Sequence, residues 1–312
     1  MRHFLKALPF AVVTMVGCGG SVGIGTGGMG IGMDTGSTSS YKKSVEDWHQ
    51  GRVERLTAEN GWLSLVGLFP IANGEHSFGS ASDNEIVLPA AAPAHAGTLT
   101  VADSVVTLDA AEGASMTHDG APLAHLVLAS DKGGAEPTEI QLGSIRFYVI
   151  DRPGSLYLRV KDADSPVRKN FKGIERYPVK QSWCVEATLD PYIPPHRLRV
   201  PNIMGYETVV DCPGALVFKI DGQEYRLEPL TQEGDEWEIV FGDATSGHET
   251  YGGGRELYCK VPGPDGKTML DFNHAYNPPC AFTQFATCPL PHRENVLPFK
   301  VEAGEKTWGD RQ

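Results

Sequence analysis

The sequence predicts an all-β protein of two antiparallel β domains, with one amphipathic helix ahead of them. Glycine and proline are frequent, at 36 and 22 of 312 residues, which favours turns and short strands over a helical bundle. Short apolar or alternating runs follow one another with turn residues between them, and only one long segment has helical periodicity. A chain of this length is typical of about two domains.

Residues 41–60 form the segment with helical periodicity. Val45, Trp48, Val53 and Leu56 fall on one side of a helix and charged residues cover the rest. The apolar side is expected to pack on the body of the protein, which explains Trp48 without giving it a function. The Asn-Gly pair at 60–61 is a natural end for this helix, and residues 61–69 then read as a buried entry into the fold.

The first β domain is predicted over residues 70–175 and the second over residues 176–306. In both, turn pairs such as Asp119-Gly120 and Asp221-Gly222 separate the apolar runs. The proline-rich segment around 191–195 is expected to belong to a connecting region rather than to a strand. Strands are expected at 85–88, 98–101, 105–108, 140–142, 145–150, 156–160, 207–210, 215–220, 224–227, 236–241, 256–261 and 268–272.

The N-terminus has the pattern of an export signal. Arg2 and Lys6 precede an apolar run that is too short to span a bilayer, and Cys18 follows it. This pattern resembles a bacterial lipobox, so we expect a signal peptide over 1–17 and lipidation of Cys18. A plain secretory signal with an incidental cysteine is the alternative. Residues 18–40 then form a flexible Gly/Ser-rich tether, and the protein is expected on the outer membrane or cell surface.

Charge and cysteine content limit the classes of partner and cofactor. The net charge is −12 and there is no basic block, which argues against nucleic-acid binding. No nucleotide loop, His-Glu-x-x-His motif or zinc spacing occurs, so neither a cofactor nor a metal is expected. In an oxidising compartment, Cys280 and Cys288 are expected to form a disulfide, and Cys184 with Cys212 is a candidate second bridge. Residues 307–312 are read as a tail.

The segment from Gly74 to Leu99 resembles a forkhead-associated (FHA) sandwich. It has a glycine, a polar turn, an isoleucine strand and a corner that ends in His95-Ala96, and His118-Asp119-Gly120 lies where that family has an Asn-Gly turn. In that family an arginine and a serine hold a phosphate, but the corresponding positions here are Ser80 and Ala92. The resemblance therefore implies the fold without phosphopeptide binding, with His95 as a structural corner residue.

Longer motifs resemble an uncharacterised bacterial family, domain of unknown function 1684. They include Glu59 to Phe69, Ser165-Pro166-x-Arg168 and the polar segments of the C-terminal third. The resemblance covers most of residues 41–306 and implies membership without an activity. His274 departs from the basic residue, such as arginine, that is expected at that position.

Polar residues of the C-terminal third are candidates for one pocket. Arg255 follows three glycines and could fork onto an anionic ligand. Asp243 and Asp271, with His274, are candidates for acid–base catalysis. The alternative is that Arg255 and an aspartate form a structural ion pair. The candidate ligand-binding residues are Arg255, Thr250, Tyr251, Asn273, Tyr276 and Asn277.

Three functions remain open from the sequence. The first is a lipid-anchored envelope protein that binds a small anionic ligand in its C-terminal domain. The second is a hydrolase that uses the aspartates and His274 or His292, with Cys280 as a less favoured nucleophile. The third is a protein-interaction scaffold built on the FHA-like sandwich.

Overall fold

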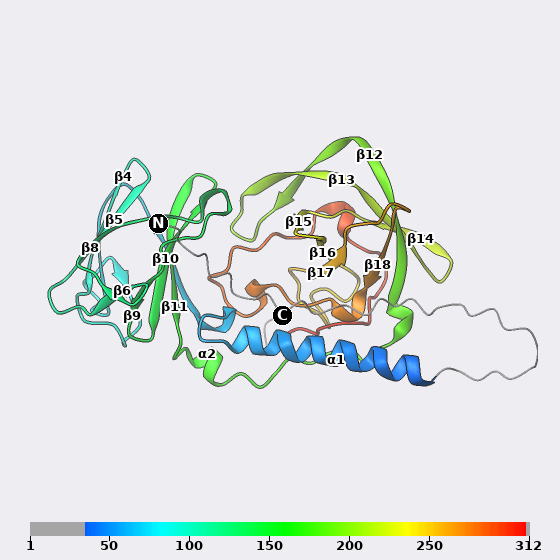
Figure 1. The fold of residues 1–312 in the computed structure, drawn as a ribbon, viewed down its shortest axis with the longest axis horizontal. Coiled ribbons are helices and arrows are strands. Elements are labelled where there is room, and N and C mark those ends of the chain that lie inside the picture. Colours follow the sequence, from blue (N-terminus) through cyan, green and yellow to red (C-terminus); the bar gives the residue numbers. More distant parts are fainter. Residues whose placement is uncertain (1–34, 310–312) are drawn as a thin grey trace, which may run out of the picture.

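The computed structural model describes residues 35–309, which form one long helix and two β units (Figure 1). Helix α1 (Thr35–Thr57) starts before the expected helix and ends three residues earlier. It runs along the C-terminal β unit, and Val45 and Leu56 on its apolar side are buried. No helix within residues 35–309 is long and apolar enough to cross a membrane.

The N-terminal unit is a sandwich of two sheets. Its strands are antiparallel neighbours except for β2 and β3, which run parallel. One sheet has the order β1 (Leu65–Ile71), β11 (Ser155–Asp162), β10 (Ile145–Arg152), β9 (Ile140–Leu142), β6 (Met116–His118), β7 (Ala121–Pro122). The other has the order β3 (Ile86–Val87), β2 (Gly74–Gly79), β4 (Gly97–Ala102), β5 (Val105–Ala110), β8 (His125–Leu128).

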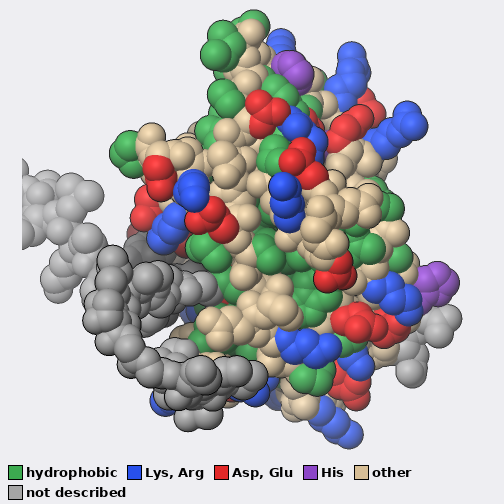
Figure 2. Space-filling model, turned by 90° about the vertical axis from the view of Figure 1, so that its right-hand side faces the viewer, with side chains coloured by type: hydrophobic (Ala, Val, Ile, Leu, Met, Phe, Trp, Pro, Cys, Tyr) green, Lys and Arg blue, Asp and Glu red, His purple; other side chains and the backbone are tan. Residues whose placement is uncertain are grey.

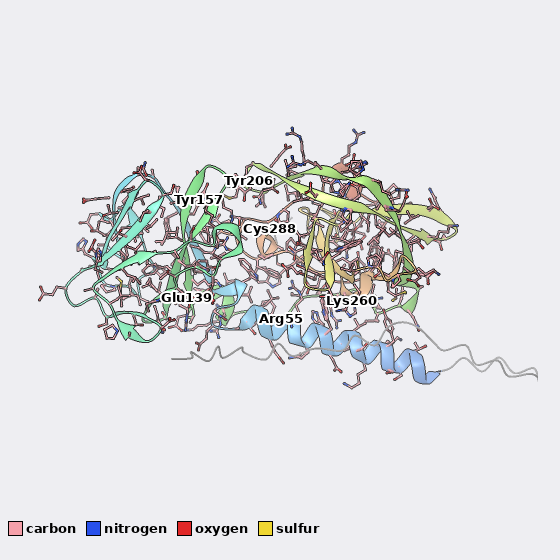
Figure 3. All side chains as sticks on the ribbon, turned by 45° about the horizontal axis from the view of Figure 1, so that its top comes forward. Arg55, Glu139, Tyr157, Tyr206, Lys260 and Cys288 are labelled. Atoms are coloured by element: carbon pink, nitrogen blue, oxygen red, sulfur yellow. The ribbon has the colours of Figure 1, made fainter. Side chains whose placement is uncertain are left out.

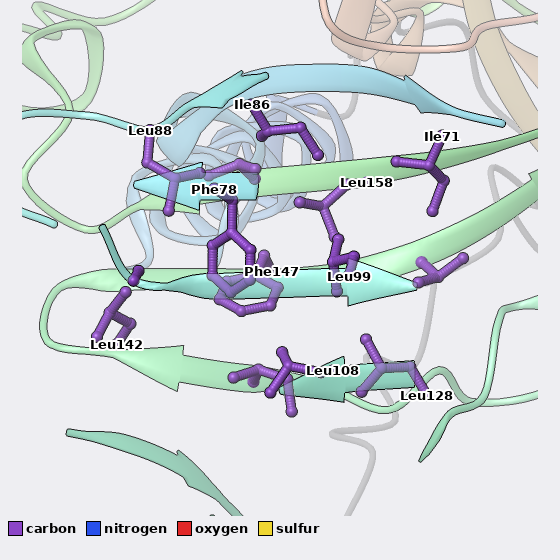
Figure 4. Close-up of a cluster of buried hydrophobic side chains, with 14 of the residues drawn as sticks. Ile71, Phe78, Ile86, Leu88, Leu99, Leu108, Leu128, Leu142, Phe147 and Leu158 are labelled. Atoms are coloured by element: carbon purple, nitrogen blue, oxygen red, sulfur yellow. The ribbon is translucent and has the colours of Figure 1, made fainter. Parts of the chain in front are cut away.

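The core of the sandwich lies between its two sheets (Figure 4). Phe78 from β2 meets Phe147 from β10 edge to face, with ring centroids 5.6 Å apart. Leu99 and Leu108 pack beside them from β4 and β5. Alternate residues of each strand point inward, which is the period of two that the sequence shows.

The corner that resembles the FHA family is closed by its own side chains. Ser80 donates a hydrogen bond to the Ala92 carbonyl at 2.8 Å, so the two positions that would hold a phosphate bond to each other. Asn84 bridges the corner by donating to the carbonyls of Ala81 and Ala94. His95 lies 3.4 Å from the Asn84 amide oxygen. The contacts agree with a structural role for His95.

The C-terminal unit combines two sheets around a second core. One has the order β14 (Gln223–Leu227), β13 (Glu207–Ile220), β12 (Cys184–Pro201), β18 (Lys267–Asp271). The other has the order β15 (Thr231–Glu233), β16 (Glu236–Phe241), β17 (Arg255–Lys260). Side chains of both sheets are buried together in this core, among them Leu216, Phe218, Trp237, Ile239 and Leu257.

A connecting region is expected from the sequence over residues 161–205. Residues 163–183 do lie between β11 and β12, but extending the region over the proline-rich residues 191–195 was wrong. These residues lie inside the 18-residue strand β12, which pairs with β13 on both sides of a register shift between Pro191 and His196. Proline cannot donate a ladder hydrogen bond, so the chain bulges where the prolines lie and then resumes its pairing. The expected strands 207–210 and 215–220 are likewise one strand, β13.

Two sets of contacts hold the helix and the β units together. The short helix α2 (Pro166–Lys169) is capped by Ser165, whose hydroxyl also donates to the Leu63 carbonyl. Arg168 Nε donates to the carbonyl of Thr57 at 2.7 Å, at the end of α1. Between the β units, Arg159 on β11 donates to Thr287 at 3.1 Å. The Ser-Pro-x-Arg motif therefore links the end of α1 to the sandwich.

Figure 2 shows the face of the molecule at the end away from the sandwich, where Lys and Arg side chains alternate with Asp and Glu. The charges on this face do not gather into a patch of one sign. The acidic balance of the sequence is thus not concentrated on this face.

Candidate functional site

Arg255, the expected ligand-binding arginine, is buried in the interior of the C-terminal unit. Its guanidinium lies 2.6 Å from Asp243 Oδ2, and both side chains have no exposed surface. It also donates to the carbonyls of Ala303 and Val301. A ligand cannot reach a guanidinium enclosed in this way, so the structural ion pair, the alternative drawn from the sequence, is the one the geometry supports.

Two other predicted site residues, Thr250 and Tyr251, make structural contacts. Thr245 binds Asp243 and shares a hydrogen bond of 2.8 Å with Thr250, which is buried. Tyr251 is half-buried and donates to the Cys280 carbonyl. Asp243 is therefore not available as a catalytic carboxylate, and Thr250 does not face a ligand.

Asp271 and Asn273 form a second cluster, under the N-terminal half of α1. Tyr41 on α1 donates to Asp271, and the Asn273 amide donates to the Tyr41 hydroxyl, both at 2.8 Å. His274 Nδ1 lies 3.2 Å from Asp271 Oδ2. Burial opposes ionisation of Asp271, but the hydrogen bond and charge of His274 hold the pKa of its carboxyl below its usual value. Asp271 is thus an ionised anchor for α1.

The expected disulfide between Cys280 and Cys288 is not formed in the structure. Both are free, buried cysteines, and the Cys280 N–H donates to Cys288 Sγ at 3.3 Å. The prediction was right about proximity and wrong about the bond. Cys212 is also free and buried, so the candidate second bridge is not formed either. Figure 3 places Cys288 between the two β units.

A cavity of about 610 Å³ lies between α1 and the sheet of β16 and β17. Three predicted residues, His274, Tyr276 and Asn277, line it. The sequence analysis missed the others, which come from α1, the segment after it and the strands. They include Trp48, Arg52, Arg55, Trp62, Glu233, Glu236, Glu256 and Tyr258.

Strand alternation places carboxylates on the side of the sheet that α1 covers. Trp237, Ile239 and Leu257 point into the core. The intervening residues point the other way, and the register sets Glu238 opposite Tyr258 and Val240 opposite Glu256. Glu238 and Glu256 are therefore diagonal neighbours on one face.

Tyr276 pairs with Glu256 at the edge of this sheet, and its ring lines the cavity. Its backbone exchanges two hydrogen bonds with Glu256, at 2.9 and 3.0 Å. Its ring stacks parallel to Tyr258 with centroids 6.4 Å apart, and Trp48 lies 6.0 Å away. His274 meets Trp48 edge to face at 4.7 Å. Aromatic faces thus line one side of the space.

Arg52 fixes the helix side of the cavity. Its guanidinium lies 4.1 Å above the Tyr276 ring and donates to Glu305 at 2.6 Å and to the Asn277 carbonyl at 2.7 Å. Glu305 in turn accepts from the Asn277 N–H. The charges of Arg52 and Glu305 therefore neutralise each other inside the protein. Arg52 holds α1 and Tyr276 in position. Arg55 lies one turn further along α1 (Figure 3).

Glu256 is the chemically distinctive group of the cavity. Burial, together with the charge of Glu238, raises the pKa of its carboxyl to about 7. It is 8% exposed, and the neighbouring Tyr276 hydroxyl offsets part of this rise in pKa. A carboxyl with this pKa exchanges a proton near neutrality, so it can donate a hydrogen bond or accept one.

Two signals in the sequence could have pointed to this cavity. Trp48, Arg52 and Arg55 recur at helical spacing on one stripe of α1. Glutamates alternate with core residues in the strand segments 236–241 and 255–260. Such glutamates are ordinarily solvent-facing, and only the packing of α1 over them turns them into a site.

Comparison with known proteins relates the C-terminal unit to a protein family. The family model described as "Protein of unknown function (DUF1684)" matches residues 169–306. The chain belongs to this family through its C-terminal unit. The family expected from the motifs is confirmed over residues 169–306, whereas the motifs extended the resemblance back to residue 41. All strand residues that line the cavity lie in the DUF1684 segment. No curated protein matches the sequence.

Solved structures are similar to parts of the chain. An uncharacterised protein of Haloarcula marismortui is 30% identical over 45% of this chain and 79% of its own, with a TM-score of 0.37. An FHA domain studied for phosphothreonine-dependent interactions is 16% identical over 30% of this chain and 92% of its own, with a TM-score of 0.22. The FhaA FHA domain, solved with the intracellular domain of Rv3910, is 16% identical over 30% of this chain and 97% of its own, with a TM-score of 0.22. The expected β-sandwich is present as the two packed sheets of the N-terminal unit.

Proposed function

We propose that this DUF1684 protein binds a small polyhydroxylated, sugar-like ligand in the cavity between α1 and strands β16 and β17. The observation that carries the proposal is the buried Glu256 carboxyl, which lies with Tyr276 in a cavity lined by aromatic rings. Ligand sites combine apolar and aromatic walls with a few convergent polar groups. Aromatic faces take up C–H faces of a sugar ring, and carboxyl groups bond its hydroxyls.

The charges of the cavity favour a neutral ligand over the anion expected from the sequence. Arg255 is enclosed in the core and Arg52 is paired with Glu305. Arg55 also lines this space, but Glu233, Glu236 and Glu256 outnumber it, so the balance of charge disfavours an anion. A cation would be repelled by Arg55, and the Tyr276 ring is already covered by Arg52. A neutral ligand with several hydroxyl groups meets none of these penalties.

Isothermal titration of the full chain tests this proposal. The probes are N-acetylglucosamine, glucose and their tetramers, with myo-inositol, citrate and choline as chemically different ligands. Binding of a saccharide by the wild type should weaken at least about tenfold in Glu256→Ala, because a buried hydrogen-bonding group is lost. Glu186→Ala removes an exposed glutamate paired with Lys267; it is the control and should bind normally. Binding of citrate or choline but of no neutral probe would contradict the proposal.

A second candidate function is hydrolysis of a glycosidic bond, with Glu256 as the acid. Its pKa near 7 is the observation that favours this activity, because a general acid works best when its pKa lies near the working pH. The Asp243 and Asp271 pair expected from the sequence is committed to structural contacts. Release of p-nitrophenol from p-nitrophenyl glycosides by the wild type, lost in Glu256→Gln, would support catalysis. Saccharide binding without release of p-nitrophenol would contradict hydrolysis and favour the ligand-binding function.

We also propose that the protein is anchored to the cell envelope through Cys18. The basic start, the short apolar run and the cysteine that follows it support this proposal. These residues lie outside the described part of the chain. The tether expected over residues 18–40 is shorter, because α1 begins at Thr35. A tether of residues 18–34 would hold the β units away from the lipid surface, with the cavity open to ligands in the envelope.

A further inference from the structure

Glu228, His292 and Glu294 form a cluster apart from the cavity. Glu228 follows strand β14, and the other two belong to the segment of the short helix η6 (Arg293–Asn295). Ligand-capable atoms of the three side chains lie within 4.8 Å of one another. Glu228 and His292 are 7% and 5% exposed, whereas Glu294 is exposed.

Two buried atoms in this cluster lack hydrogen-bond partners, and they face each other. His292 Nδ1 lies 3.0 Å from Glu294 Oε2. A carboxylate only accepts, so Nδ1 carries the proton, and Nε2 of a neutral imidazole then has a free lone pair. Nε2 lies 3.5 Å from Glu228 Oε2, and neither atom makes a hydrogen bond. In the neutral tautomer two buried acceptors therefore point at one another, which is costly unless a cation, either a proton or a metal ion, lies between them.

We propose that Glu228 and His292 bind a divalent transition-metal ion of the zinc class, with Glu294 orienting the imidazole. Two ligands at ~2.1 Å from a tetrahedral metal are about 3.4 Å apart, close to the separation of Nε2 and Oε2. Glu294 holds the Nδ1 proton in the manner of carboxylate–histidine–metal triads. Glu228 and His292 supply two ligands, so water would fill the remaining coordination positions.

The surrounding hydrogen bonds hold both ligands in place before a metal arrives. The Tyr192 hydroxyl donates to Glu228 Oε1 at 2.5 Å, which leaves Oε2 toward His292. Asn295 accepts from the Glu228 N–H and donates to the Glu228 carbonyl, both at 2.8 Å. A second donor bond joins Asn295 to the Val240 carbonyl. A bound metal would therefore fasten the 292–295 segment to the end of β14 and stabilise the folded C-terminal unit.

Cobalt substitution tests the site in the full chain. Metal-free protein, prepared with a chelator and dialysed, is titrated with Co²⁺ and followed by visible absorption. We expect d–d bands that saturate at one equivalent and are displaced by Zn²⁺. Zn²⁺ at ~100 times its dissociation constant should raise the midpoint of thermal unfolding by about 5 °C.

Three variants separate the site from adventitious binding. His292→Ala and Glu228→Gln should abolish the cobalt bands, and Glu294→Gln should weaken Co²⁺ binding about 10- to 100-fold while the fold is kept. His125→Ala, which removes an exposed histidine beside Asp109, is the matched control and should bind as the wild type does. A folded wild type without cobalt bands would overturn the proposal and leave a protonated His292 between two glutamates. Equal Co²⁺ binding by Glu294→Gln and the wild type would show that Glu294 is not part of the proposed site.

Discussion

Arg255 and Asp243 form an ion pair with 2.6 Å between guanidinium nitrogen and carboxylate oxygen, and neither side chain has exposed surface. The guanidinium also donates to two backbone carbonyls of the C-terminal segment 301–303. The pair ties strand β17 to the loop after β16 and to the last part of the chain. An arginine that follows three glycines thus serves the fold instead of a ligand.

Breaking this pair should destabilise the protein strongly. Arg255→Ala leaves the Asp243 charge buried without its partner, which costs about 3–5 kcal/mol of unfolding free energy. Urea unfolding followed by circular dichroism measures this loss, and Arg226→Ala, from an exposed pair with Asp190, is the control at below about 1 kcal/mol. A stable Arg255 variant that loses only ligand affinity would restore the ligand-binding role.

Stability should fall as the pH rises through the titration of Glu256. The pKa of the folded carboxyl is about 7 and its usual value is 4.5, so the folded state holds the proton more tightly. The stability from this group is present below about pH 4.5 and is lost as the pH rises toward 7, by about 3 kcal/mol at most. Unfolding free energies at pH 5 and pH 8 should differ less in Glu256→Gln than in the wild type. An identical difference in both proteins would show that Glu256 is ionised throughout.

The cysteines of the C-terminal unit should react as thiols only after unfolding. Cys212, Cys259, Cys280 and Cys288 are free and buried. Alkylation with iodoacetamide followed by peptide mapping should leave these four unmodified in the native protein and label them all in urea without a reductant. A peptide that joins Cys280 to Cys288 in that sample would show that the two adjacent residues form the disulfide expected from the sequence.

Anchoring should depend on one cysteine. Cys18→Ala removes the cysteine that would be acylated if the lipobox-like pattern is functional. We expect the variant to move from the membrane fraction to the soluble fraction of the envelope and to lose incorporation of labelled palmitate. Membrane association that survives in Cys18→Ala would contradict a lipid anchor at that position.

The sequence predicted the β architecture because period-two alternation is local. The strands expected at 236–241 and 256–261 match β16 and β17 closely, since turn residues mark their ends. Strand β12 was not predicted, because the prolines at 191, 194 and 195 are local evidence against a strand. Its pairing with β13 on both sides of the bulge overrides that evidence, and this pairing depends on residues distant in sequence.

The candidate site was predicted only in part, for a similar reason. Tyr276 and Asn277 were correctly grouped as pocket residues, but Arg255 was assigned to a ligand when it lies in the core. The glutamates at 236 and 256 look like exposed strand residues until α1 covers them. Which face a helix covers depends on contacts such as Arg52 with Glu305, which are 253 residues apart in the chain.

Native mass spectrometry of the purified full chain tests the cavity most directly. Wild type and Trp48→Ala are compared after purification from a bacterial envelope under identical conditions, with folding checked by circular dichroism. We predict that the wild type retains a noncovalent mass that fragments as a polyhydroxylated compound, and that Trp48→Ala, which lacks one aromatic wall, loses it. A wild type without such a mass, or a mass kept equally by both proteins, would contradict binding in this cavity.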